Sequence, residues 1–153
     1  MTISSPTTGA RARVSSGQLA TFRLDGDLYG VEVEHVQEVL RSQGLTRVPL
    51  APKAVAGLIN LRGQVVTAIE LRERLGRPPR PEGTDAVVIV VRLHGEAVSL
   101  LVDSIADVVD VDDADFEAPP DTLEGQARDL IRGAYKLDGQ LLLALDVQKA
   151  VFA

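Results

Sequence analysis

The chain has 153 residues, 45% of them hydrophobic and 25% charged, which is enough apolar sequence for one domain or for two very small domains sharing a core. Its net charge of −6 argues against a general nucleic-acid binder, because such a protein needs a surplus of lysine and arginine on one face. The absence of cysteine excludes disulfides, thiolate metal sites and cysteine nucleophiles, and with only 3% aromatic residues the core is expected to be aliphatic.

The N-terminal stretch, residues 1–18, contains two arginines but no apolar run behind them, so it does not resemble a secretion signal. Its serine, threonine and glycine content predicts a flexible tail, followed by a folded part over residues 19–153. No stretch approaches the ~18 to 20 continuous apolar residues that a membrane helix needs. These features predict a cytoplasmic protein that does not insert into the membrane.

A short turn of the form Leu-x-Gly, followed by a polar residue, recurs along the chain. Its copies are LDGD at 24–27, LRGQ at 61–64, LHGE at 93–96 and LDGQ at 137–140. Each lies between two runs with β-type patterning, and Asp-Gly and its relatives suit tight hairpins because they tolerate positive φ. The repeat therefore predicts four hairpins.

Three of these hairpins are followed by an acidic residue that opens a segment with helical character. The segments are EHVQEVL from Glu34, ELRERLG from Glu70 and DVQKAVF from Asp146. An acidic residue is favourable at the N-terminal end of a helix dipole, so we predict three short helices. In the first, a period of 3.6 residues places one set of side chains on a common buried face: Val33, Val36, Val39 and Leu40. For DSIADVV, which begins at Asp103, helix and strand are both compatible with the sequence.

Two predicted strands, AVVIVVRL and AVSLLV, are apolar on both faces, so each must be covered on both sides. A position between two barrels would provide this cover, and so would a barrel wall that docks a partner. The architecture is therefore predicted to be mostly β, with two small barrels of about five strands each that close their own edges, and with short helices. The basic, proline-rich segment RERLGRPPRPEGTD suggests an approximate boundary within residues 76–85. A terminal strand that crosses from one barrel to the other is compatible with this division.

The sequence carries no recognisable catalytic constellation. It lacks a G-x-S-x-G elbow, a G-x-G-x-x-G motif and a phosphate-binding loop, so we predict neither an enzyme nor a cofactor. Residues 103–124 contain nine acidic side chains and no basic one, and part of this run has the spacing of an EF-hand loop. Ala118 occupies the position where that loop needs glycine, so we predict a solvated acidic edge and no metal. A hydrolase that uses this segment is the alternative.

Arg62 is the strong cation among the residues that precede the four turn glycines. Its planar fork suits bidentate pairing with a carboxylate, and Glu38 is the candidate partner. An arginine held in this way at a loop tip is a typical interface anchor, whereas the alternative is a solvated loop arginine. Four other arginines lack interleaved aromatic residues and are predicted to form a solvated helix end and linker: Arg72, Arg74, Arg77 and Arg80.

Several of these stretches together resemble the CheW family of bacterial chemotaxis coupling proteins, over residues 19–152. They are FRLDGDLYGVEVEHVQEVL, LTRVPLAPKAVAGLINLRGQVV, IELRERLG, VVIVVRLHGEAVSLLVDSIADVV and IRGAYKLDGQLLLALDVQKAV. The resemblance implies two SH3-like β-barrels packed on each other. It also implies a non-enzymatic adaptor that joins the cytoplasmic tips of methyl-accepting chemoreceptors to the regulatory domain of the histidine kinase CheA, by end-to-end barrel contacts in membrane-associated receptor arrays.

The resemblance also assigns partner-binding positions. Glu38 and Arg62 match the family's charged pair near the partner surfaces. Further positions match ones associated with receptor or kinase coupling: Val36, Gly57, Val87, Val108 and Gly133. The two-sided apolar strand that contains Val87 fits a receptor helix lying in a groove.

The chain departs from the family pattern at two places. Thr67 and Ala68 stand where relatives commonly have a proline before a DLR-like segment, and Glu70 replaces the usual aspartate. Two alternatives stay open at this point, namely a CheW homologue that serves a surface-motility or gene-regulatory pathway, and an oligonucleotide-binding barrel protein.

Overall fold

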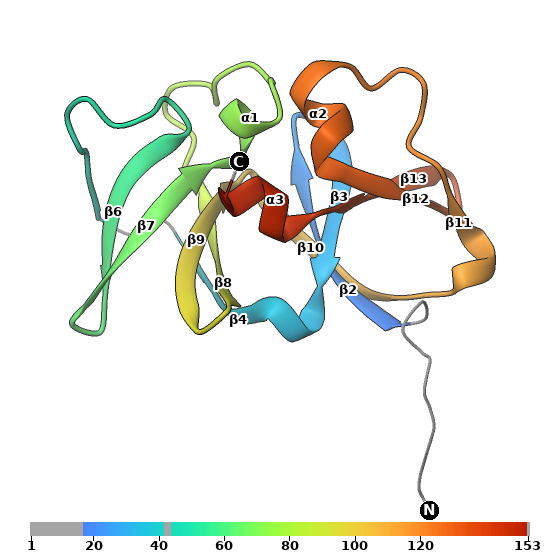
Figure 1. Cartoon of the computed structure of the whole chain (residues 1–153), viewed down its shortest axis with the longest axis horizontal. Coiled ribbons are helices and arrows are strands. Elements are labelled where there is room, and N and C mark those ends of the chain that lie inside the picture. The colour runs from blue at the N-terminus through green and yellow to red at the C-terminus, as the bar shows by residue number, and fades with distance from the viewer. Residues whose placement is uncertain (1–16, 42–43, 153) are drawn as a thin grey trace, which may run out of the picture.

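The computed structural model describes residues 17–41 and 44–152, which fold into two β-sheets with short helices (Figure 1). The predicted flexible tail, residues 1–18, lies outside the described residues except for Gly17 and Gln18, which begin the first strand. Among the residues that the structure describes, no helix has the length and apolarity needed to cross a membrane.

One sheet, which we call the terminal sheet, combines strands from both ends of the described chain. Its six strands, in spatial order, are β10 (Ser104–Val111), β2 (Gly17–Leu24), β3 (Asp27–Glu32), β13 (Gln140–Leu145), β12 (Ile131–Leu137) and β11 (Phe116–Glu117). Neighbouring strands are antiparallel, except that β13 and β3 run parallel. The blue hairpin β2–β3 therefore lies in the same body as the red strands β12 and β13 (Figure 1).

The other sheet, which we call the central sheet, contains the strands between these two groups. Its six strands, in spatial order, are β4 (Val36–Arg41), β8 (Val87–Leu93), β9 (Glu96–Val102), β7 (Gln64–Glu70), β6 (Val55–Leu61) and β5 (Leu45–Thr46). β7 and β9 run parallel, at the place that β13 and β3 occupy in the terminal sheet. Each sheet thus has five longer strands and one of two residues, and forms the wall of one SH3-like barrel, as predicted.

The four predicted hairpins are confirmed, because β2–β3, β6–β7, β8–β9 and β12–β13 are antiparallel pairs joined at the four turns. Three of the residues before the turn glycines have positive φ although they are not glycine, namely Asp25, Arg62 and His94. The glycines that follow them also have positive φ, which is the backbone pattern that tight hairpin turns require.

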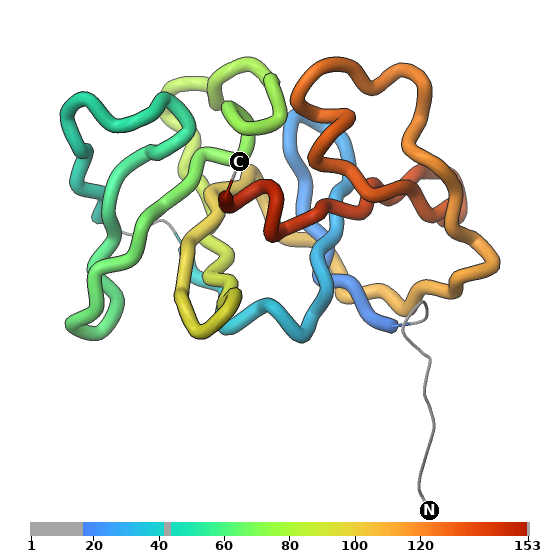
Figure 2. The backbone as a smooth tube through the Cα atoms, in the orientation of Figure 1, coloured from blue at the N-terminus to red at the C-terminus, as the bar shows by residue number. Residues whose placement is uncertain are grey.

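The chain passes between the sheets twice within the described residues, a path that Figure 2 traces. The first crossing is the 3-10 helix η1 (Val33–His35), between β3 and β4. The second is Asp103, the single residue between β9 and β10. Residues 76–85 join helix α1 to β8, and the strands on either side of them, β7 and β8, both belong to the central sheet. The subdomain boundary placed in this segment stays a prediction.

The largest apolar cluster, which we call the shared core, draws side chains from both sheets and from helices α1 (Leu71–Arg74), α2 (Gly125–Leu130) and α3 (Val147–Phe152). Figure 1 shows α3 lying across the junction of the two bodies. Two smaller clusters fill the individual barrels. The position of β8 between two cores explains why its sequence is apolar on both faces. Ile89 and Val91 face the shared core, while Val88 and Val90 face the central barrel's own core.

The prediction of a helix over residues 34–40 is wrong. Beyond η1 the chain forms β4, in which exposure alternates and Val39 is 45% exposed. The helical period of 3.6 residues and the strand period of two residues both place Val36 and Leu40 on one face, because the two residues are four positions apart. Antiparallel pairing with the buried strand β8 decides in favour of the strand.

The other two predicted helices are confirmed. Glu70 caps α1 by accepting a hydrogen bond from the backbone N–H of Arg72, and α3 follows Asp146. The segment DSIADVV forms β10, the strand alternative. The predicted acidic edge is exposed from Asp107 to Glu124, where its acidic residues lie in β10, in or beside the 3-10 helix η2 (Asp113–Asp115), in β11 and before α2. Asp103, at its start, departs from the prediction, because it is partly buried and binds Arg72 and Arg80.

Candidate functional site

Arg62 and Glu38 form the predicted charged pair on the central barrel. Arg62 Nη1 lies 2.6 Å from Glu38 Oε2, and Nη2 lies 2.8 Å from Oε1, so the contact is bidentate. The Arg62 side chain is 76% exposed, whereas that of Glu38 is 17% exposed. The carboxylate therefore holds one edge of the guanidinium while the rest of the cation is presented to the outside.

Local structure brings these two side chains together from distant parts of the sequence. Arg62 lies at the β6–β7 turn with a φ of 52°, and Asn60 Oδ1 braces the turn by accepting the Gly63 N–H at 3.0 Å. Glu38 lies on β4, directly after a register shift between Val36 and Glu38. A hydrogen bond from Arg62 lowers the pKa of Glu38, and the same bond raises the pKa of Arg62. Both groups are therefore charged at neutral pH.

Gly57 and Gly133 are buried positions at which another strand approaches closely. Gly57 has a φ of 153°, and a Cβ there would lie 2.9 Å from the Thr46 carbonyl carbon, on β5. A Cβ on Gly133 would lie 2.5 Å from the Glu117 carbonyl oxygen and 2.7 Å from Phe116 Cε1, on β11. Both glycines are buried, so they permit the two-residue strands to pair closely rather than offering contact area.

The three predicted valines do not form one surface. Val36 and Val87 lie on the neighbouring strands β4 and β8 and pack, partly buried, against the shared core. Val108 lies on β10, at the edge of the terminal sheet, and is 57% exposed. The apolar faces of β8 are covered by the protein's own cores, so this strand needs no partner to bury it. The partner-binding roles of all seven positions stay predictions.

The arginines near α1 correct the prediction of a solvated helix end and linker. Arg72 is 6% exposed and makes a bidentate contact with Asp103, with Nε 2.9 Å from Oδ1 and Nη2 2.6 Å from Oδ2. Arg80 Nε lies 3.1 Å from Asp103 Oδ1, and its two terminal nitrogens bind both oxygens of Glu70 at 2.9 and 3.2 Å. Arg72 and Arg80 are thus structural. One signal for this was available in the sequence, because an aspartate between two apolar strands needs a cationic partner if it is buried.

The two remaining arginines of this group also bind protein groups. Arg77 binds Asp27 and donates a hydrogen bond to the hydroxyl of the buried Tyr29 at 2.9 Å. Arg74 Nε donates to the carbonyl oxygen of Ala150 at 2.7 Å, near the end of α3. Cations at a helix C-terminus complement the free carbonyl groups there.

The ion pairs of this network lower the pKa of Asp103. Burial raises it, but hydrogen bonds from Arg72 and from the Asp25 backbone N–H, together with the charges of Arg72 and Arg80, outweigh that effect and lower the pKa to about 2. The carboxylate is therefore ionised throughout the neutral range.

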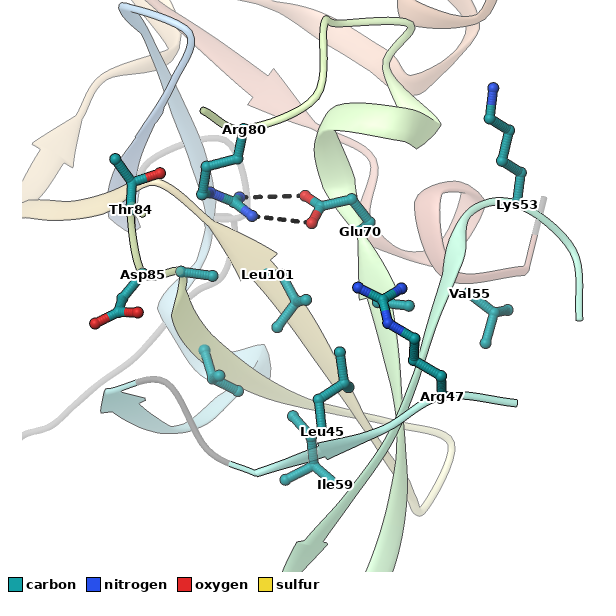
Figure 3. A pocket seen from close by; sticks show the side chains of 13 residues that line it. Leu45, Arg47, Lys53, Val55, Ile59, Glu70, Arg80, Thr84, Asp85 and Leu101 are labelled. Carbon is teal, nitrogen blue, oxygen red and sulfur yellow. Dashed lines mark hydrogen bonds and ion pairs between the residues drawn. The ribbon is translucent and has the colours of Figure 1, made fainter. Parts of the chain in front are cut away.

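A hollow of about 320 Å³ lies at the mouth of the central barrel (Figure 3). Its floor is aliphatic and includes Leu45, Ile59 and Leu101, while Arg47 and Lys53 stand at its rim. Glu70, Arg80, Thr84 and Asp85 also line this hollow, so it combines an aliphatic floor with side chains of both charges. Its lining residues include no histidine, serine or tyrosine.

One cluster of titratable groups, at η1, is not evident from the sequence. Ligand atoms of Glu32, Glu34 and His35 all lie within 4.8 Å of one another. Burial, followed by a hydrogen bond with Glu34, raises the pKa of Glu32.

Comparison with known proteins shows what the chain is similar to. The model of the CheW-like domain matches residues 18–151. The chemotaxis protein CheW of Rhizobium meliloti is 30% identical over 142 residues, covering 92% of both chains. The chemotaxis protein CheW of Treponema pallidum is 29% identical over 136 residues, covering 86% of this chain and 80% of that protein. The crystal structure of the scaffolding protein TtCheW from Thermoanaerobacter tengcongensis superposes with a TM-score of 0.76 at 28% identity, covering 86% of this chain and 89% of that one.

Proposed function

The chain belongs to the CheW family and is a chemotaxis adaptor, and from this premise we propose that it couples the cytoplasmic tips of methyl-accepting chemoreceptors to the regulatory domain of a CheA-type histidine kinase. It acts as a non-enzymatic scaffold in the cytoplasm, and receptor arrays recruit it to the membrane surface. The relatives and the solved scaffolding protein support this role, and none of them favours the oligonucleotide-binding alternative.

The observation that carries the proposal is the preorganised pair of Arg62 and Glu38. Two charge-assisted hydrogen bonds fix the guanidinium before any partner arrives, so binding orders little that is not already ordered. An exposed arginine that a carboxylate holds at a loop tip is suited to a protein interface, where arginine is enriched among energetically important residues. We assign the kinase contact to this end of the central barrel.

We assign the receptor contact to exposed apolar side chains of the sheet edges. Val108 and Ile105 on β10 are 57% and 43% exposed, and Val39 on β4 is 45% exposed. An amphipathic receptor helix would bury such aliphatic side chains through its apolar face. This assignment keeps Val108 as a direct contact and gives Val36 and Val87 a supporting role beneath the surface.

With two docking faces, the protein would transmit a signal by linkage. A receptor rearrangement changes kinase activity only if the contacts differ between the two receptor states. Individual contacts can be modest, because many copies in one array add avidity.

The test is co-sedimentation of the protein with a CheA-type kinase and a receptor signalling fragment. Arg62→Ala is expected to reduce incorporation of the kinase while the fold stays intact. Arg92→Ala is the matched control, since Arg92 is an exposed arginine of the same barrel that binds Gln37 and the Gly95 carbonyl. Wild-type protein that sediments with neither partner would contradict the proposed function.

A further inference from the structure

Asp103 stands where the chain returns from the central sheet to the terminal sheet. It is the single residue between β9 and β10, and its backbone N–H donates to the Arg23 carbonyl of β2 at 3.1 Å. The other crossing, η1, has no buried residue. In Figure 1 the segment between β3 and β4 lies at the opposite end of the junction from α1. The two crossings therefore differ in how firmly they are held.

The Asp103 carboxylate accepts four hydrogen bonds, which fills its acceptor capacity. Oδ1 accepts from Arg72 Nε and Arg80 Nε at 2.9 and 3.1 Å. Oδ2 accepts from Arg72 Nη2 at 2.6 Å and from the Asp25 backbone N–H at 2.8 Å. Asp25 belongs to the β2–β3 turn of the terminal barrel, whereas both arginines belong to the segment between β7 and β8 of the central barrel.

The two arginines are themselves fixed by groups of the central barrel. Arg80 also makes a bidentate contact with Glu70 at the end of β7, which Figure 3 shows. Arg72 Nη1 donates to the Pro78 carbonyl at 2.7 Å, and the Arg72 backbone N–H is bound by Glu70. Neither cation can follow Asp103 if the terminal barrel rotates, because each is tied to the central barrel on its other side.

We propose that Asp103 is a positioning residue that fixes the orientation of the two barrels relative to each other. Apolar burial in the shared core holds the barrels together, but it is non-directional. Bidentate ion pairs require a fixed plane and separation, so they select one orientation among those that the core allows. The proposed kinase contact lies on the central barrel, whereas Val108 and Ile105 of the proposed receptor contact lie on the terminal barrel. The orientation of the barrels therefore sets the geometry in which both partners are held.

The direct test of this proposal is a distance between the two barrels, and this measurement does not depend on the proposed function. Only the kinase-activation readout rests on the proposed function. The chain has no cysteine, so a pair of spin labels can be placed at Gln64→Cys on the central barrel and Asp138→Cys on the terminal barrel. In this background we compare Asp103→Asn and Arg80→Gln with the control Arg92→Gln. Arg80→Gln leaves the contact between Arg72 and Asp103 in place and is the milder change. If Asp103→Asn fails to fold, the distance distribution of Arg80→Gln tests the proposal.

We expect both junction variants to broaden or shift the distance distribution, and the control to leave it unchanged. In unlabelled protein without the two added cysteines, binding to the isolated kinase regulatory domain and to the receptor fragment should each stay within about twofold, because neither proposed docking face is altered. Receptor-dependent activation of the kinase should fall about three- to tenfold, which a merely structural role would not produce without loss of binding.

A folded Arg80→Gln protein whose distance distribution matches that of the wild type would overturn the inference. If instead the wild-type protein binds neither kinase nor receptor, the proposed function fails. The distance measurement still decides whether Asp103 fixes the barrels.

Discussion

Gly57 and Gly133 occupy equivalent places in the two barrels. Each follows a register shift, between Val55 and Gly57 in β6 and between Ile131 and Gly133 in β12. Each lies on the strand that pairs with the two-residue strand of its sheet. Both are positions to which the family resemblance attributes partner coupling, and in both the neighbouring backbone leaves no space for a side chain.

Substitution of either glycine by alanine is therefore expected to act through the fold. Gly57→Ala and Gly133→Ala should each lower the free energy of unfolding by about 2 to 4 kcal/mol, because a Cβ meets backbone atoms that cannot move away cheaply. Urea denaturation measures this change. Gly44→Ala is the control, since a Cβ there meets nothing within 4 Å. Stable variants that lose only partner binding would show that the glycines are contact positions instead.

The Arg62–Glu38 pair should matter for binding and little for stability. Because Arg62 is largely exposed, Arg62→Ala should leave the free energy of unfolding nearly unchanged. Arg62→Lys keeps the charge but loses the bidentate geometry, so it should bind the kinase regulatory domain more weakly than the wild type.

Calorimetric titration of the single and double variants separates the two effects. In a double-mutant cycle with Glu38→Gln, the double variant should lose much less binding free energy than the sum of the two single losses, because Glu38 acts by holding Arg62. Additive losses would mean that Glu38 contacts the partner independently.

The Asp103 network predicts a specific acid sensitivity. The folded-state pKa of about 2 lies below the ordinary value of 3.8, so this carboxylate contributes stability above pH 3.8 that is lost as the pH falls through about 2. The contribution at neutral pH is about 2 kcal/mol. The free energy of unfolding, measured by urea denaturation between pH 2 and 5, should fall less steeply with decreasing pH for Asp103→Asn than for the wild type. Identical slopes for the two proteins would contradict the prediction.

Arg74 should hold the end of α3 on the junction. Arg74→Met keeps the aliphatic stem but removes the donors to the Ala150 and Val151 carbonyl oxygens. We expect faster amide exchange confined to α3 and a loss of about 1 kcal/mol in stability. Lys149→Met, on the exposed face of the same helix, is the matched control. Equal exchange rates in both variants would show that the shared core alone holds the helix.

Local patterns in the sequence were sufficient for the hairpins and for two of the helices. The Leu-x-Gly turns need positive φ at fixed positions, and this requirement involves only neighbouring residues. The capped segments after Glu70 and Asp146 are likewise local. The segment after Val33 was misassigned because a spacing of four residues suits a helix and a strand equally, and only pairing with β8 separates them.

By itself, the sequence determined a cysteine-free, aliphatic, mostly β chain of repeated hairpins, and it made Glu38 the candidate partner of Arg62. Only the tertiary structure decided which strands share a barrel and which charges are buried. The N-terminal hairpin pairs with the C-terminal strands, and Arg72 closes on an aspartate 31 positions away. Strand order and ion pairing depend on contacts between residues far apart in the chain, and no local pattern of hydrophobicity or charge encodes those distances.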